Sequence, residues 1–335
     1  MSLRLHGDTL ARPGMLDFAV NVWPGQRPPA LQAVLADALA NGERYPDESE
    51  ARSAIAARHR RSPDEVLLTN GACDAFWLIA HAYRPKTPAL IHPSFTEPEA
   101  ALLAAGSDVV HVLREPERWT FDASEVPADA DCVVLGNPNN PTGTLEPPAT
   151  LTALARRGRL LVIDESFIDF VASERASLAG HHEIPGLIVV RSLTKLWSLA
   201  GIRAGYLLAP AEIVERLAAN RQPWSVNSLA CAALTACAGD RDTPRRVAAD
   251  VAVARTELAD ALARLPGVRV WPSVANFLLI RVADGPGVVE GLRQRGIAVR
   301  PAASFPGLDQ RYIRTAVRTR DDNAILVEAC TELLS

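Results

Sequence analysis

Residues 132–143, CVVLGNPNNPTG, carry the clearest structural signal in this chain of 335 residues. The segment starts with a short apolar run and passes directly into a turn rich in Asn, Pro and Gly. A continuous apolar run is typical of a strand that is covered on both faces. A strand ending in such a turn brings amide side chains to the carboxyl edge of a parallel sheet, where open α/β folds bind small ligands. Taken alone, the turn is also compatible with an ordinary loop, so the neighbouring segments matter.

Similar apolar runs recur along the chain, and amphipathic stretches separate most of them. We expect strands at Glu65–Thr69, Ala89–His92, Val109–Leu113, Cys132–Leu135, Leu160–Ile163, Leu187–Val190 and Gly205–Leu208. We expect helices at Cys73–Tyr83, Glu97–Ala105, Pro148–Arg157 and Glu212–Asn220. This alternation predicts an α/β fold with a mostly parallel, seven-stranded sheet that is covered by helices on both sides.

The pattern changes after about residue 240. A long helix is expected at Asp242–Leu265, because Pro266 and Gly267 end its periodicity. Shorter segments follow, with strands at Val268–Trp271, Phe277–Val282, Ala298–Arg300 and Tyr312–Val317 and helices at Gly287–Arg295 and Arg320–Leu334. We therefore predict an N-terminal arm at residues 1–30, a large domain at 31–240 and a small α+β domain at 241–335.

The composition excludes several classes of protein. A net charge of −4, with 22% charged residues, argues against nucleic acid or other polyanions as partners. No apolar run reaches the roughly 18 residues of a membrane span, and the N-terminus lacks the apolar segment of a signal peptide. The five cysteines are scattered and form no CxxC pair, which favours reduced thiols and argues against a zinc site. We expect a cytoplasmic protein without a metal site or a membrane partner.

Lysine is nearly absent from this chain. Of the 35 residues that are Lys or Arg, only Lys86 and Lys195 are lysines. A lysine kept in such an Arg-rich sequence can serve where a neutral amine nucleophile is needed, which arginine cannot provide. Lys86 stands in a polar turn and is predicted to be a surface charge, whereas Lys195 stands among apolar and small residues.

Two further segments give the turn at 137–143 a chemical meaning. Residues 160–170, LLVIDESFIDF, end an apolar run in Asp164, which could be a metal ligand, a helix cap or the counter-ion of a buried cation. Residues 192–195, SLTK, and Arg203 offer two hydroxyls, an amine and a guanidinium, which together can hold a phosphate and form an imine. An imine-forming lysine, a carboxylate for a pyridinium nitrogen, an amide for a phenolic oxygen and a phosphate cradle are what pyridoxal 5′-phosphate requires.

In order and spacing, NPNNPTG, DESF, SLTK and IRAG resemble the motifs of fold-type I pyridoxal-phosphate enzymes of the class I and II aminotransferase group. The resemblance extends from about His6 to the C-terminus. It implies pyridoxal 5′-phosphate as the cofactor, a small domain that closes over the substrate, and a homodimer with its active sites at the interface.

The resemblance also assigns roles to individual residues. Lys195 matches the lysine that forms the Schiff base, and Asp164 matches the partner of the pyridine nitrogen. The first turn of a helix is a ready anion site, which supports a phosphate contact at Ala72 and Cys73. The other matches are Asn140 for the ring's 3′ oxygen, Phe95 for ring stacking, Ser192, Arg203 and more weakly Thr194 for the phosphate, Tyr45 for the cofactor phosphate of the neighbouring subunit, and Arg314 for the substrate carboxylate.

Two members of the group compete as models for this chain, and both act on small phosphorylated amines. Three features resemble threonine-phosphate decarboxylase of cobalamin biosynthesis more than histidinol-phosphate aminotransferase. These are His6-Gly7 ahead of the stretch 17–24, DESF in place of DEAY, and RSLTK followed by an aromatic residue. We therefore expect a decarboxylase-like enzyme, with the aminotransferase as the alternative. A catalytically silent ligand-binding protein is the alternative of another class, and the joint retention of Lys195 and Asp164 argues against it.

The phosphate of the substrate needs donors outside the cofactor cradle. His6, Arg300 and Arg318 are the candidates, and Asn21 is expected to border the substrate pocket. If Tyr312–Val317 is a strand, Arg318 shares the parity of Arg314 and projects from the same face.

Overall fold

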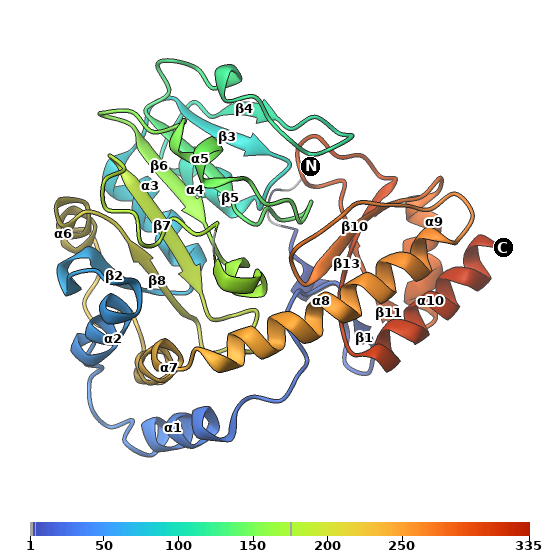
Figure 1. Cartoon of the computed structure of the whole chain (residues 1–335), viewed down its shortest axis with the longest axis horizontal. Helices are drawn as coiled ribbons and strands as arrows, with labels where there is room; N and C mark the ends of the chain where they lie inside the picture. Colours follow the sequence, from blue (N-terminus) through green and yellow to red (C-terminus); the bar gives the residue numbers. More distant parts are fainter. Residues whose placement is uncertain (1–2, 4, 175) are drawn as a thin grey trace.

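The structure is a computed structural model of the chain and describes residues 3, 5–174 and 176–335. A large sheet with helices around it forms one region, and a smaller sheet with helices packed beside it forms the other (Figure 1). The long helix α8 (Asp242–Ala263) contacts both regions. No helix in the described part of the chain is long and apolar enough to cross a membrane.

All seven strands expected in the large sheet are confirmed. They are β2 (Val66–Asn70), β3 (Pro88–His92), β4 (Val110–Leu113), β5 (Cys132–Gly136), β6 (Leu160–Asp164), β7 (Leu187–Ser192) and β8 (Ala204–Leu208). Their order is β2-β8-β7-β6-β5-β3-β4, and only β8 runs antiparallel to its neighbours. The carboxyl ends of β5, β6 and β7 therefore lie side by side, which brings the three motifs together.

The apolar runs are explained by burial on both faces of this sheet. Alternate residues of β6 point into different hydrophobic clusters, with Leu161 and Ile163 on one side and Val162 on the other. Helices α3 (Ala72–Tyr83), α4 (Glu97–Ala104) and α6 (Ala211–Ala219) cover the face of Val162. The opposite face is covered by α1 (Pro29–Ala40), α2 (Ser49–His59), α5 (Pro148–Thr152) and α7 (Ser228–Gly239).

Two expectations about helices need correction. The helix expected at Pro148–Arg157 ends at Thr152. In the turn that follows, the carbonyl of Leu154 accepts a hydrogen bond from the Arg159 side chain and is not used to continue the helix. Helices α1, α2 and α7 were not predicted. Residues such as Ala230 and Leu234 of α7 are fully buried, so a helix enclosed in this way shows no polar stripe along its sequence.

The small region contains an antiparallel sheet in the order β12-β13-β10-β9. Its elements are β9 (Arg269–Val270), β10 (Phe277–Arg281), α9 (Gly285–Gln294), β12 (Arg300–Pro301), β13 (Tyr312–Ala316) and α10 (Arg320–Leu334). The single strand expected at Ala298–Arg300 is in fact two strands. Ala298 belongs to β11 (Ile297–Ala298), which pairs outside this sheet, whereas Arg300 pairs with Arg314 of β13.

The partner of β11 is the N-terminal segment, whose strand β1 (Leu16–Asp17) runs parallel to it. The N–H group of Phe18 donates to the Ala298 carbonyl at 2.8 Å, and its own carbonyl accepts from Ala316 at 2.9 Å. Further on, the N–H group of Trp23 donates to the carbonyl of Lys195 at 3.0 Å. The segment therefore bridges both regions, and the domain boundaries at residues 30 and 240 stay a prediction.

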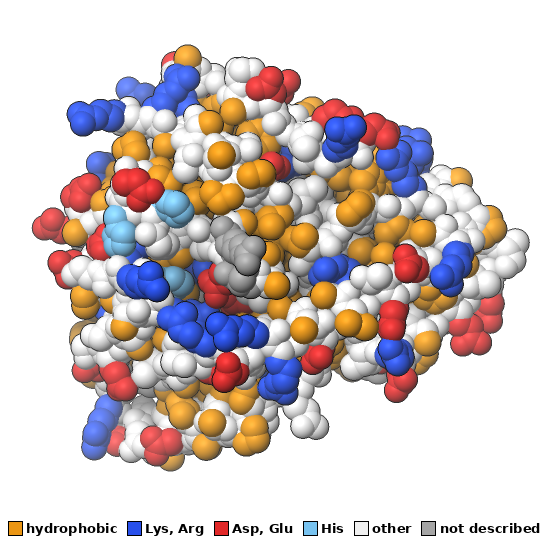
Figure 2. All heavy atoms as spheres, viewed as in Figure 1, with side chains coloured by type: hydrophobic (Ala, Val, Ile, Leu, Met, Phe, Trp, Pro, Cys, Tyr) orange, Lys and Arg blue, Asp and Glu red, His pale blue; other side chains and the backbone are white. Residues whose placement is uncertain are grey.

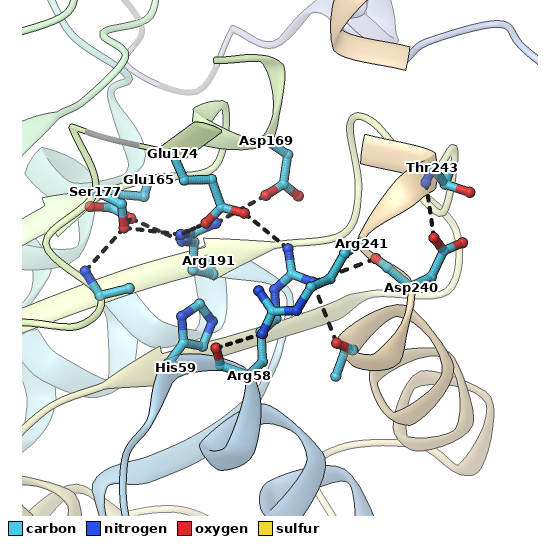
Figure 3. Close-up of polar contacts among 12 residues, drawn as sticks. Arg58, His59, Glu165, Asp169, Glu174, Ser177, Arg191, Asp240, Arg241 and Thr243 are labelled. Carbon is cyan, nitrogen blue, oxygen red and sulfur yellow. Dashed lines mark hydrogen bonds and ion pairs between the residues drawn. The ribbon is translucent and has the colours of Figure 1, made fainter. Parts of the chain in front are cut away.

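A buried network of charges fixes the segment that follows β6 (Figure 3). The Arg191 guanidinium lies 2.9 Å from Glu165, 3.0 Å from Asp169 and 2.7 Å from Glu174. Arg58 of α2 reaches Glu174 from the other side at 2.9 Å. Because removal of one member of a buried pair leaves an uncompensated charge, this network is expected to hold α2 and β7 against the segment strongly.

Candidate active site

A cavity of about 600 Å³ lies where the carboxyl ends of the large sheet meet the N-terminal segment and the small sheet. Ten of the residues that the sequence marked as site residues line it: His6, Asn21, Cys73, Phe95, Asn140, Thr194, Lys195, Arg203, Arg300 and Arg314. A second cavity of about 180 Å³, beside Arg58 and Glu174, contains none of them. Most of the predicted site residues therefore converge on one place.

The amine of Lys195 lies 5.8 Å from the centre of the Phe167 ring. Phe167 is buried and packs edge-on against Phe277, so this side of the amine is apolar. Burial lowers the pKa of Lys195 to about 8, and the Arg314 cation contributes in the same direction. A substantial fraction of the amine is therefore neutral near pH 8, as a nucleophile requires.

Asp164, at the end of β6, borders a small cavity together with Phe95 and Asn140. Burial raises the pKa of the Asp164 carboxyl, and hydrogen bonds from the Ser166 N–H group at 2.9 Å and hydroxyl at 2.5 Å oppose the rise. A buried carboxylate of this kind gains from a cationic partner. An aromatic ring, an amide and this carboxylate around one space fit a protonated pyridine ring with a phenolic oxygen.

An anion cradle lies at the start of α3. Gly71 precedes the helix with φ of 80°, and a Cβ atom there would collide with the Arg203 guanidinium. Arg203 donates only to the backbone carbonyls of Asn70 and Ala200 and has no ion pair among the described residues. Ser192 pairs with Gly205 of β8, which packs against the backbone of Gly71. The Ser192 hydroxyl donates to Thr194 Oγ1 at 2.8 Å. Free N–H groups, hydroxyls and an unpaired guanidinium are what a phosphate group needs.

Two more arginines are buried on the other side of the cavity. Arg314 donates to Asn140 Oδ1 at 2.7 Å and to the Ala19 carbonyl at 2.6 Å, while its Nε atom is buried without a partner. Arg300 donates to Ser304 at 2.6 Å. Burial lowers the pKa of Arg314 to about 9 and that of Arg300 to about 10. Neither forms an ion pair with a described residue, so both favour an anionic ligand.

His6 lies at the cavity in a role that the sequence did not indicate. Its Nε2 atom is 2.7 Å from Oε1 of Glu97, whose other oxygen accepts from the indole of Trp77 at 3.1 Å. Glu97 also lines the cavity and was not predicted. In the sequence, only the position of Glu97 two residues after Phe95 pointed to the site. Its partner His6 is far away in sequence, so the pair could not be recognised.

Two predicted residues lie away from the cavity. Arg318 pairs with Asp322 at 3.0 Å and donates to the Asp17 carbonyl. Strand β13 ends at Ala316, so the alternation that was expected to align Arg318 with Arg314 does not continue. Tyr45 is 75% exposed and stacks on Trp224, with ring centres 4.5 Å apart.

On the face shown in Figure 2, acidic and basic side chains are interspersed with hydrophobic ones over most of the surface, and several basic side chains adjoin one another below and to the left of the centre. Cationic side chains also gather at the cavity, which Lys195, Arg203, Arg300 and Arg314 line. This arrangement suits a small anionic ligand.

Comparisons with known proteins agree with this reading of the site. Residues 13–330 match the family described as aminotransferase class I and II. The chain is 43% identical, over 98% of its length and 90% of the other, to a protein of Mycobacterium tuberculosis named histidinol-phosphate aminotransferase. It is 32% identical to threonine-phosphate decarboxylase of Salmonella typhimurium, over 96% of its length and 92% of the other.

Solved structures give the same result. The histidinol-phosphate aminotransferase of Clostridium acetobutylicum is 26% identical with a TM-score of 0.88, covering 94% of this chain and 98% of that one. The L-threonine-O-3-phosphate decarboxylase of Porphyromonas gingivalis is 27% identical with a TM-score of 0.86, covering 95% and 98%. The chain therefore belongs to the class I and II aminotransferase family and is an enzyme that depends on pyridoxal 5′-phosphate.

Proposed function

We propose that this enzyme decarboxylates a small phosphorylated amino acid of the threonine phosphate type. The observation that carries the proposal is the pair of buried arginines, Arg300 and Arg314, which have no anionic partner among the described residues. Both come from the small sheet, whereas Arg203 stands directly before β8 of the large sheet. Threonine phosphate brings two anionic groups, a carboxylate and a phosphate, whereas histidinol phosphate brings only one.

Pyridoxal phosphate, when bound, supplies an aldehyde that takes up amines and a ring that accepts the electron pair of a bond broken at the α-carbon. The chain's residues hold it as follows in this proposal: Asp164 at the ring nitrogen, Asn140 at the 3′ oxygen, Phe95 on the ring face, and Ala72, Cys73, Ser192, Thr194 and Arg203 at the phosphate.

Lys195 and Arg314 would then act on the substrate. Lys195, whose pKa is near 8, would be the amine that holds the aldehyde of the cofactor, and its ammonium form would be the acid that gives a proton to the α-carbon. Arg314 binds the carboxylate and so sets which bond at the α-carbon stands perpendicular to the ring. Arg300, which also lines the cavity, would bind the substrate phosphate, and His6 would contribute only if it turned away from Glu97.

Histidinol-phosphate aminotransferase is the second candidate, and the 43% identical relatives favour it. Transamination also needs an acidic keto acid as amino acceptor, and the same two arginines would bind its carboxylates. A silent ligand-binding protein is disfavoured, because Lys195, Asp164, Asn140 and Arg203 are all retained around one site.

The proposal includes a homodimer. Its support is the stacked pair Tyr45 and Trp224, which are 75% and 59% exposed although they are large aromatic side chains. A second copy that covers this pair would bring Tyr45 to the cofactor phosphate of its neighbour.

Single-turnover incubation tests the reaction. The holoenzyme is mixed with threonine phosphate, and separately with histidinol phosphate, without a keto acid, and both carbon dioxide and cofactor absorbance are followed. We expect carbon dioxide from threonine phosphate with the cofactor regenerated, and none from Lys195→Ala. Conversion of the cofactor to pyridoxamine phosphate by histidinol phosphate, without carbon dioxide from threonine phosphate, would establish the aminotransferase instead.

A further inference from the structure

Three side chains meet outside the cavity, where β3, β4 and α4 come together. The Nε2 atom of His111 lies 2.7 Å from Oε1 of Glu99, and the Nε2 atom of His92 lies 3.3 Å from Oε2 of the same carboxylate. The two imidazole rings are 4.4 Å apart, and the three donor groups offer one atom each within 4.8 Å of one another. None of the three lines the cavity.

Two of these atoms are unsatisfied. Nε2 of His92 and Oε2 of Glu99 are both buried and lie 3.3 Å apart, but they lack the alignment of a hydrogen bond and have no other partner. The Ser94 hydroxyl lies 3.3 Å from Nδ1 of His92 and donates to the Phe95 carbonyl at 3.5 Å, so it can accept the Nδ1 proton. That tautomer turns the Nε2 lone pair toward the carboxylate. Two acceptors that face each other in a buried place call for a cation between them.

We propose that His92, Glu99 and His111 bind one zinc ion, with water as the fourth ligand. Two imidazoles and one carboxylate, with an open fourth position, are a set that zinc accepts, whereas Mg²⁺ and Ca²⁺ prefer oxygen ligands. At metal–ligand distances of about 2.0–2.1 Å, tetrahedral ligand atoms lie about 3.3 Å apart. The separation between His92 and Glu99 already has this value, at 3.3 Å.

The remaining geometry also suits the metal. His111 contacts the other oxygen of Glu99, Oε1, at 2.7 Å. For one carboxylate oxygen to serve as the ligand, the His111 ring must shift so that its Nε2 atom lies about 3.3 Å from that oxygen. The side chain of His111 is 38% exposed, so it can make that adjustment and leaves one side of the site open to water. The cysteine pattern gave no hint of this site, because its ligands come from three separate elements.

The site is connected to the cavity through the chain. His92 ends β3 and Glu99 lies in the first turn of α4, and the segment between them carries Phe95 and Glu97, which line the cavity. A zinc ion that joins His92 to Glu99 would fix both ends of this segment. Zinc should therefore raise the thermal midpoint of the holoenzyme.

Isothermal titration of the holoenzyme with zinc chloride tests the proposal. We expect one zinc ion per chain at this site, with affinity reduced by more than about tenfold in His111→Asn and in Glu99→Gln. His181→Asn is the matched control. His181 is also 38% exposed and lies 2.6 Å from Glu183, but no third ligand joins them among the described residues.

The thermal shift gives the second readout. Zinc should raise the midpoint of the wild type and of His181→Asn, and should leave that of His111→Asn unchanged. Because His111 is partly exposed, His111→Asn is expected to fold, and its midpoint without zinc checks this. Equal zinc affinities in His111→Asn and His181→Asn would assign the metal to thiols or to the cofactor and would overturn the proposal, as would the absence of zinc binding.

Discussion

Nη1 of Arg314 donates to Oδ1 of Asn140 at 2.7 Å, and this bond joins β13 of the small sheet to the turn after β5 of the large one. Asn140 is the residue assigned to the cofactor ring, and Arg314 is the residue assigned to the substrate carboxylate. The two binding functions therefore share a hydrogen bond, and a change at Arg314 also alters the surroundings of Asn140.

Replacing Arg314 by Lys should weaken the use of a carboxylated substrate. Lysine keeps the charge but cannot bond Asn140, the Ala19 carbonyl and a carboxylate at once. The loss of one charged hydrogen bond predicts a fall in kcat/KM of about 10- to 100-fold. Steady-state kinetics measure this, and kcat/KM equal to that of the wild type would remove Arg314 from carboxylate binding.

The two lysines offer a matched pair. Reduction of the holoenzyme with borohydride should attach the cofactor to the peptide of Lys195, and mass spectrometry locates it. Lys86→Ala should show the same label and normal activity, while Lys195→Ala should show neither. A label on Lys86 would refute the assignment.

The acidity of Lys195 predicts a pH dependence. Because the pKa of Lys195 is near 8, the fraction of its amine that is neutral rises between pH 7 and pH 9. The apoenzyme should therefore take up cofactor faster as the pH is raised over this range. Because the Arg314 cation helps to lower this pKa, Arg314→Leu should shift the profile to higher pH. Stopped-flow absorbance of cofactor uptake measures it, and an unshifted profile would contradict the coupling.

The charge network in Figure 3 predicts acid lability. Burial raises the pKa of Glu174, but the Arg191 guanidinium outweighs this effect and lowers the pKa to about 2. The pKa is thus lower in the folded state, so the stabilisation is present above about pH 4.5 and is lost as the pH falls toward 2. Glu174→Gln should lower the free energy of unfolding by about 3 kcal/mol at pH 7, and by less at pH 3.5.

Urea titrations at the two pH values measure this difference. Glu183→Gln serves as the control, since Glu183 pairs with His181 at the surface and its loss should hardly alter stability. A difference between wild type and Glu174→Gln that is the same at both pH values would contradict the assigned pKa.

The sequence predicted the parts of this molecule that depend on local pattern. Strands such as β6 are buried on both faces, so their apolar runs are continuous and easily recognised. Asp164 and Lys195 follow such strands directly, and parallel strands bring their carboxyl ends together. Glu97 was missed and Arg318 misplaced because their surroundings depend on His6, far away in sequence, and on the residue at which β13 ends.

The pairing of β1 with β11 has a consequence for how the enzyme is made. Asp17 is synthesised long before its partner Ala298, because most of the large sheet lies between them in the chain. At translation rates of about 5–20 residues per second, this segment waits roughly tens of seconds for its strand. The part of the cavity wall formed by the N-terminal segment and the small sheet therefore cannot assemble before β11 has been made, and catalytic competence should appear only after that point.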